Sequence, residues 1–142
     1  MLILGHPLIP SDRFIFIKNT DGVHSSTNND IVCFEAHPKN LELAKYCCGN
    51  GVNFSVIFLS HKIETDTFFL FNAFKPLYCI FKDIKQAILA QQHATNYLLD
   101  SKILFSMDLN DTELWEICAK NQIDGVISKD SLPLNKPFLN KS

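Results

Sequence analysis

Short apolar runs recur at a regular interval along the chain, beginning just after Asp30. Each run is rich in Ile, Val, Phe or Leu and lacks polar alternation, which is typical of strands covered on both faces. A helical pattern fills each gap between consecutive runs, and this alternation predicts right-handed crossovers and a parallel sheet. The runs are Ile31–Ala36, Asn53–Ser60, Leu77–Phe81, Lys102–Met107 and Asp124–Ser128.

The helical pattern in the first gap has a clear end. One stripe of the expected helix holds Leu41, Ala44, Cys47 and Cys48, so this helix should pack against the sheet. Gly49 and Gly51 follow this stripe, and glycine favours the left-handed conformation that ends many helices. We expect the helix to stop at these glycines.

Two later helices carry signals at their beginnings. Asp83 is placed to cap one of them, and Asn110 precedes Glu113 by three positions, as in a capping box. The stretch Lys18–Asp30 is polar and rich in turn-forming residues instead, so it predicts a loop or one frayed helical turn.

Together these elements predict an α/β fold with three layers and a flavodoxin-like open sheet of five or six mostly parallel strands, in the order 2-1-3-4-5. The sixth strand would be Phe14–Ile17. Residues 1–30 then form an N-terminal extension with one or two short strands that pack on the sheet, the other candidate being Leu2–Leu4. Residues 31–131 form the α/β domain, and residues 132–142 form a C-terminal tail that is ordered only by docking.

The segment Ile63–Phe74 is apolar on nearly every side of its expected helix. One interpretation is that this helix is buried deep against the sheet. The other is that its outer face, with Phe68 and Phe71, contacts a second subunit, because phenylalanines in water would form an exposed apolar patch. The second interpretation predicts a protein partner, with a homodimer as the simplest case.

The composition fits one folded domain that can build its own core. Of the 142 residues, 46% are hydrophobic and 11% are aromatic, so burial can offset the entropy of ordering the chain. The formal net charge of −2 gives no electrostatic basis for binding nucleic acid or an anionic membrane. No segment approaches the roughly 20 apolar residues of a membrane helix. Arg13 is the only arginine, so a bidentate arginine clamp on phosphate is not expected.

The cysteines and histidines predict reduced thiols and no zinc site. The five cysteines form no Cys-x-x-Cys pair, and Cys33, Cys79 and Cys118 fall in apolar runs or on an apolar helical face. This usage is typical of a cytoplasmic protein. The histidines show neither of the common zinc-binding spacings, so we expect no metal held by histidine.

Polar side chains follow each expected strand at its carboxyl end. Loops at this edge of an open parallel sheet converge, and ligands bind there in many such folds. Polar loops at the ends of strands are also common without any function, because they cap helices and face water. The side chains at this edge are Glu35 and His37, Ser60 and His61, Lys82 and Asp83, Ser106 and Asp108, and Ser128, Lys129 and Asp130.

The run KILFSMDLNDTELWEICAKNQIDGVISKDSLP resembles the last part of a response-regulator receiver domain. Receivers end their fourth strand in Ser or Thr and their fifth strand in Lys, and Ser106 and Lys129 occupy those positions. The run IVCFEAHPKNLELAKYC is similar to the first receiver strand and helix, and LYCIFKDIK is similar to the third strand with its phospho-acceptor, here Asp83. The resemblance covers about residues 31–131.

The chain departs from receivers at the acidic site. Receivers hold Mg²⁺ with an acidic pair after the first strand, whereas here Glu35 is followed by Ala36. One carboxylate fewer predicts weaker Mg²⁺ binding, because Mg²⁺ prefers six oxygen ligands. Asp83 follows Lys82 and is equally well explained as a helix cap. The resemblance therefore implies a non-catalytic, receiver-like interaction or regulatory module.

A second resemblance implies a different function. The run CAKNQIDGVIS is similar to the helix–strand units of phosphate-binding (β/α)₈ barrels. Too few units are present to close such a barrel, so an open sheet or a half-barrel that dimerises is expected. The alternative function is a small-ligand or phosphate-handling enzyme, with Glu35 and Asp83 on a cation and Lys129 on an anionic group. Whether the chain is an enzyme stays open at this point.

Overall fold

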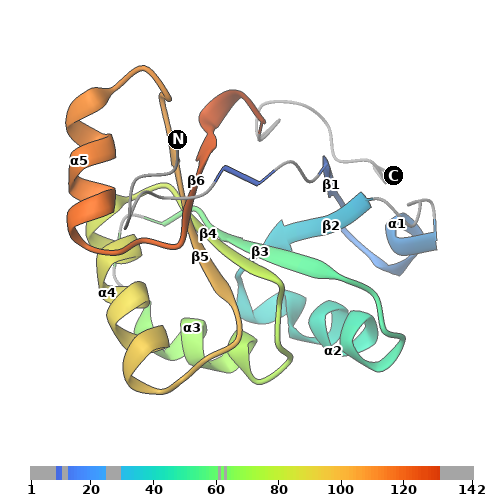
Figure 1. Cartoon of the computed structure of the whole chain (residues 1–142). Coiled ribbons are helices and arrows are strands. Elements are labelled where there is room, and N and C mark those ends of the chain that lie inside the picture. The colour runs from blue at the N-terminus through green and yellow to red at the C-terminus, as the bar shows by residue number, and fades with distance from the viewer. Residues whose placement is uncertain (1–8, 11–12, 25–29, 61, 63, 132–142) are drawn as a thin grey trace.

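In a computed structural model, the described residues form six strands and five helices that alternate along the chain (Figure 1). The structure describes residues 9–10, 13–24, 30–60, 62 and 64–131. The strands are β1 (Arg13–Phe16), β2 (Asp30–Glu35), β3 (Phe54–Phe58), β4 (Tyr78–Phe81), β5 (Lys102–Met107) and β6 (Gly125–Ser128). The helices are α1 (Thr20–His24), α2 (Leu41–Gly49), α3 (Thr65–Asn72), α4 (Ile84–Asn96) and α5 (Thr112–Lys120), with short 3-10 helices η1 (Pro38–Asn40) and η2 (Lys129–Ser131).

The α/β class and the open, all-parallel sheet of six strands are confirmed. Each predicted apolar run contains a strand, and the predicted strand Phe14–Ile17 corresponds to β1, which pairs with β2. The predicted strand Leu2–Leu4 and the tail 132–142 lie outside the described residues. The stretch Lys18–Asp30 contains the five-residue helix α1, in agreement with the expected single turn.

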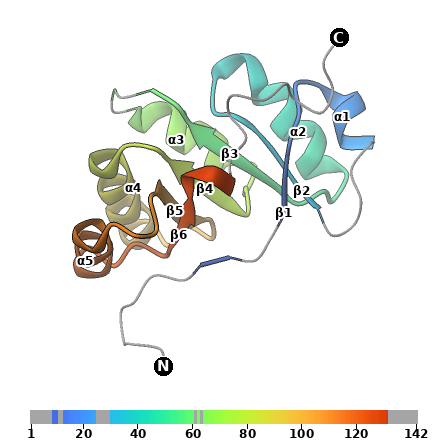
Figure 2. The same cartoon turned by 90° about the horizontal axis from the view of Figure 1, so that it is seen from above.

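The strand order differs from the predicted 2-1-3-4-5. Each strand pairs only with the strands before and after it in the chain, so the order is β1-β2-β3-β4-β5-β6. With right-handed crossovers, this order places successive helices on the same face of the sheet. The described helices accordingly line one face, where Figures 1 and 2 show them around the outside of the sheet. The predicted second helical layer is not present among these residues.

Both faces of the strands are nonetheless buried, which explains the apolar runs without polar alternation. In β2, Val32 and Phe34 pack in the core under the helices, whereas Ile31 and Cys33 belong to a second apolar cluster on the opposite face. This second cluster is built from residues in and next to the strands. Successive strand residues point to opposite faces, so a strand buried on both needs apolar residues throughout.

The sheet is curled, and side chains on its concave face meet across it. The rings of Phe14 on β1 and Tyr78 on β4 lie 5.8 Å apart between centroids, although β2 and β3 separate their strands. Neighbouring strands are about 4.8 Å apart, so a flat sheet would separate these rings by roughly 14 Å. Side chains of the strands therefore fill the space on the concave face, as they do in the interior of a small barrel.

The helix boundaries follow the predicted signals with one shift. Gly51 adopts a left-handed conformation with φ of 66° just after α2 ends, as the glycine pattern predicted. Asp83 is the N-cap residue of α4. The N-cap of α5 is Asp111 and not Asn110, because the Asp111 carboxylate accepts a hydrogen bond of 3.1 Å from the Leu114 N–H.

Helix α3 packs against the sheet through its phenylalanines. Phe68 and Phe71 are 2% and 0% exposed, so neither side chain reaches the surface of the chain. The Phe68 ring lies 6.2 Å from Phe58 of β3, and the Phe71 ring lies 6.5 Å from Phe34 of β2. Leu70, in contrast, is 49% exposed on the same helix. A partner that contacts α3 would therefore meet Leu70 and not the two buried rings.

Leu98 follows the C-cap of α4 and adopts the left-handed backbone conformation that glycine prefers. Its φ is 54°, and the Leu99 N–H donates to the Ala94 carbonyl at 2.9 Å, which is the pattern of a Schellman motif. A left-handed residue with a Cβ is strained by about 1–2 kcal/mol. Leu98 is also 86% exposed, so its side chain contributes little to packing.

We expect Leu98→Gly to raise the free energy of unfolding by about 1 kcal/mol, measured by urea denaturation. Leu98→Ala is the matched control, because alanine removes the exposed leucine but keeps the Cβ. An equal gain in both variants would show that removal of the leucine side chain, and not relief of the backbone, causes the effect.

Candidate functional site

A charged hollow of about 420 Å³ lies at the carboxyl ends of β1 and β2. Lys18 comes from the loop after β1, and Glu35 is the last residue of β2. Lys39 and Asn40 come from η1, and the buried Ile17 completes the wall. The hollow is therefore built where open parallel sheets commonly bind ligands.

Hydrogen bonds fasten η1 to the end of β2. The Asn40 side-chain amide donates to the Glu35 carbonyl at 2.8 Å. His37 is the N-cap of η1, and its Nδ1 accepts from the Lys39 N–H at 3.1 Å, while Pro38 provides a fixed first turn. The backbone that carries Lys39 is thus held in place, while the exposed ammonium group can move.

The strand period places Glu35 on the concave face of the sheet. Cys33 lies on the concave face, so Glu35, two residues later in β2, follows it on that face. Phe16 also lies on the concave face, and Lys18 follows it by two residues beyond the β1 end. The Ile17 N–H extends the β1–β2 pairing to the Cys33 carbonyl at 3.0 Å. Glu35 and Lys18 line the same hollow, so a carboxylate and a cation lie together at this edge of the sheet.

Of the four candidate residues predicted at this edge, Glu35 alone lines the hollow. Asp83 is half-buried at the start of α4, and Ser106 is buried in β5. Lys129 is exposed at the start of η2, after β6. Asp83 follows β4, Ser106 lies within β5 and Lys129 follows β6, and β3 separates β4 from the strand that carries Glu35. The predicted set is thus divided between two parts of the edge.

Lys18 and Lys39 were not predicted as site residues. The rule that selects Glu35, a polar residue at the carboxyl end of an apolar strand, applies equally to Lys18 after Phe14–Ile17. Lys18 was instead assigned to the polar loop that follows. Lys39 has no such signal, because its place in the hollow depends on the turn at His37 and Pro38.

The hollow offers Mg²⁺ fewer carboxylates than the acidic pair that the receiver resemblance implies. Among the described residues that line it, Glu35 is the one carboxylate. Mg²⁺ is usually held by one or two carboxylates together with several waters or phosphates, and Asp83 belongs to another part of the edge. Within the described part of the chain, no three His, Cys, Asp or Glu side chains gather as metal ligands would.

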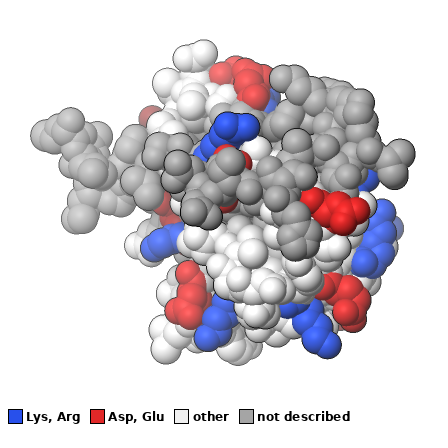
Figure 3. All heavy atoms as spheres, turned by 90° about the vertical axis from the view of Figure 1, so that its right-hand side faces the viewer, with Lys and Arg blue, Asp and Glu red and all other residues white. Residues whose placement is uncertain are grey.

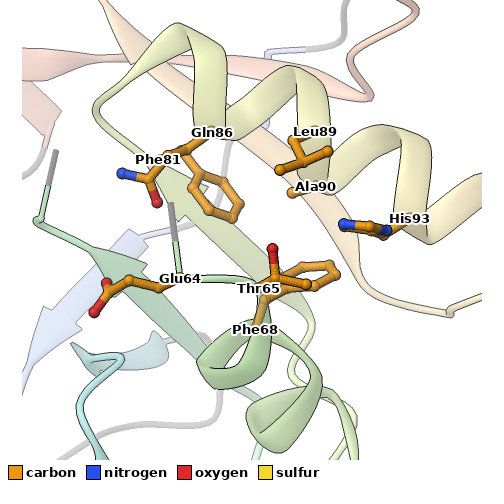
Figure 4. A pocket seen from close by; sticks show the side chains of 8 residues that line it. All are labelled: Glu64, Thr65, Phe68, Phe81, Gln86, Leu89, Ala90 and His93. Carbon is orange, nitrogen blue, oxygen red and sulfur yellow. The ribbon is translucent and has the colours of Figure 1, made fainter. Parts of the chain in front are cut away.

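The cavity between α3 and α4 is too small for a substrate. The rings of Phe68 and Phe81 lie between the two helices, with Ala90 and His93 on the α4 side (Figure 4). The cavity measures about 10 Å³, which is at the lower limit for a single water molecule. The His93 ring packs 5.1 Å from Phe69. This region is part of the core and not a binding site for a larger molecule.

The buried thiols are poorly suited to nucleophilic chemistry. Burial raises the pKa of Cys47 to about 11, with a further contribution from the neighbouring Cys48, and burial raises the pKa of Cys118 to about 11. A thiol must lose its proton to react, so these cysteines stay protonated and inert near neutral pH. Cys48 is the exposed cysteine of the chain.

The side of the molecule that carries α1 has mixed charge. Lys and Arg side chains are interspersed there with Asp and Glu around an uncharged area (Figure 3). Such a surface does not attract one sign of charge over a long range. Any preference for a charged ligand must therefore come from close contacts within a hollow.

Fold and site define an α/β protein with a singly wound, curled parallel sheet and a charged hollow at its carboxyl edge. No protein-family model matches the chain, and no curated protein matches its sequence. None of the described helices is long and apolar enough to cross a membrane.

Proposed function

We propose that the chain binds a small anionic ligand in the hollow formed by Lys18, Glu35, Lys39 and Asn40. The observation that supports this proposal is a hollow of about 420 Å³, lined by two lysines, at the carboxyl ends of parallel strands. Its size is within the range of small-molecule sites, and its position is the one that open α/β sheets use for ligands.

The chemistry of the lining residues favours an anion that also carries a hydrogen-bond donor. The ammonium groups of Lys18 and Lys39 can bind a phosphate or carboxylate as point charges. The Glu35 carboxylate accepts hydrogen bonds from a hydroxyl or amine. Arg13 is at the other end of β1 and pairs with Asp30 at 3.5 Å, so it does not take part.

The experiment is calorimetric titration of the purified chain with inorganic phosphate and with ribose 5-phosphate. We expect Lys39→Ala to weaken binding of ribose 5-phosphate at least tenfold, because a hydrogen bond to a charged group contributes about 1.5–3 kcal/mol. Lys120→Ala, on the exposed end of α5, is the matched control and should bind like the unchanged chain. Equal affinity in Lys39→Ala and the unchanged chain would contradict the proposal, and so would no binding at millimolar concentration.

A second candidate function is the receiver-like interaction or regulatory module. Tyr97 and Leu98 are 64% and 86% exposed at the end of α4, and the Tyr97 ring lies 5.2 Å from Phe69 of α3. Adjacent exposed apolar side chains of this size favour contact with a protein partner or a second copy. A monomeric mass in light scattering at micromolar concentration would exclude the homodimer.

A further inference from the structure

A second hollow adjoins the first on the side of α2. It measures about 610 Å³ and shares Lys18, Lys39 and Asn40 with the hollow that contains Glu35. These shared residues therefore stand between two compartments. A ligand whose anionic group lies at Lys18 and Lys39 has room to extend to either side.

The two compartments differ in chemistry. The compartment at the sheet edge contains the Glu35 carboxylate. The compartment at α2 contains the half-buried Tyr46 and the buried Leu43. Leu43 and Tyr46 are three residues apart and therefore lie on the same face of α2. An aliphatic side chain and an aromatic ring together form a wall against which a flat ring can pack.

We infer that the ligand is a phosphate monoester attached to a planar heterocycle, with the chemistry of a nucleoside monophosphate. This inference rests on the proposed anion site and names the class of ligand that the site would select. The phosphate lies between Lys18 and Lys39, the heterocycle packs against Tyr46, and a hydroxyl or amine donates to Glu35.

The charges around the two compartments agree with a ligand of this kind. Lys45 and Glu42 line the second compartment in addition to the shared lysines. Among the described residues, three lysines and two glutamates therefore line the combined space. The excess of one positive charge suits an anion, while the carboxylates disfavour a second acidic group far from the lysines.

The test is titration calorimetry with adenosine monophosphate, adenosine and inorganic phosphate as probes. We expect adenosine monophosphate to bind at least tenfold more tightly than inorganic phosphate, because stacking of a base on an aromatic ring strengthens binding by about that factor or more. Adenosine, which lacks the phosphate, should bind at least tenfold more weakly than the monophosphate. Lys39→Ala should weaken binding of both phosphate-bearing probes by a similar factor.

Variants at Tyr46 separate the ring from the anion site. Tyr46→Ala should remove the preference for the monophosphate over inorganic phosphate, whereas Tyr46→Phe should keep it. Phenylalanine preserves the ring, so this variant remains informative if alanine unfolds the half-buried site. Equal binding of the monophosphate and inorganic phosphate, both sensitive to Lys39→Ala, would overturn the inference and leave the proposed anion site standing. No binding of either phosphate would overturn both.

Discussion

Replacing Phe71 with glutamate is expected to unfold the chain and not merely to detach a partner. The Phe71 side chain is fully buried beneath the sheet. Loss of its ring costs about 3–5 kcal/mol, and an unpaired buried carboxylate adds several more. A domain of this kind has a total stability of about 5–15 kcal/mol, so the variant loses most or all of it. Thermal and urea unfolding followed by circular dichroism measure the effect.

Leu70→Glu is the matched control on the same helix. Leu70 is 49% exposed, so a charge there stays in water and should change the free energy of unfolding by about 0.5 kcal/mol or less. This variant can also test whether a partner contacts α3, because it alters the surface without unfolding the chain. A cooperative unfolding transition of Phe71→Glu near that of the unchanged chain would contradict the structure of α3.

The second large effect is a loss of stability at alkaline pH. Burial raises the pKa of Cys47 and Cys118 from 9.0 to about 11. Burial also raises the pKa of Cys79, to about 12, although hydrogen bonds with Ser101 and Asn72 oppose this. Burial likewise raises the pKa of the Cys33 thiol. Above pH 9.0 the unfolded chain therefore releases protons that the folded chain still holds.

The sign of the effect follows from this difference in bound protons. The stabilisation by the protonated thiols is complete below about pH 9 and is lost as the pH rises through the folded pKa values. Each buried thiol should lower the free energy of unfolding by about 1.4 kcal/mol per pH unit in this interval. Urea unfolding at a series of pH values between about 8 and 10 measures the slope.

Two cysteine variants assign the slope to buried thiols. Cys118→Ala removes one buried thiol and should reduce the slope of the unfolding free energy against pH by about 1.4 kcal/mol per pH unit. Cys48→Ser should leave it unchanged, because Cys48 is exposed. All other residues are the same in the variants, so their contributions to the slope cancel in the comparison. An unchanged slope in Cys118→Ala would show that other groups control the alkaline transition.

The sequence predicts the positions of the strands better than their order. Runs such as Ile103–Phe105 in β5 are apolar at consecutive positions because both faces of the strand are buried, and this requirement is visible locally. Strand order has no such local mark. The order 2-1-3-4-5 and the sequential order need the same strands, helices and right-handed crossovers, and they differ in which strands pair and in which face of the sheet the helices cover. The periodicity of a helix does not tell which face of the sheet it meets.

The candidate site could be predicted only in part for a related reason. Glu35 could be predicted as a site residue because it lies at the carboxyl end of a strand. Lys18 lies just beyond the carboxyl end of the preceding strand, so the same argument applies to it. Asp83, Ser106 and Lys129 also follow or end strands, but their distance from Glu35 depends on strand order. Lys39 depends on a local turn that brings η1 back over the end of β2. Composition and spacing reveal neither the strand order nor the position of this turn.

The sequential order of the strands also determines how the chain can assemble. Every strand pairs with its neighbour in sequence, so each new pairing closes a loop of similar, modest length. The entropy lost in closing a loop grows only slowly with its length, and here no pairing needs a long return across the sheet. Strand–helix units can therefore be added one after another from any starting point, as in a repeat array. A ribosome that releases the chain from its N-terminus would expose these units in the order in which they pair.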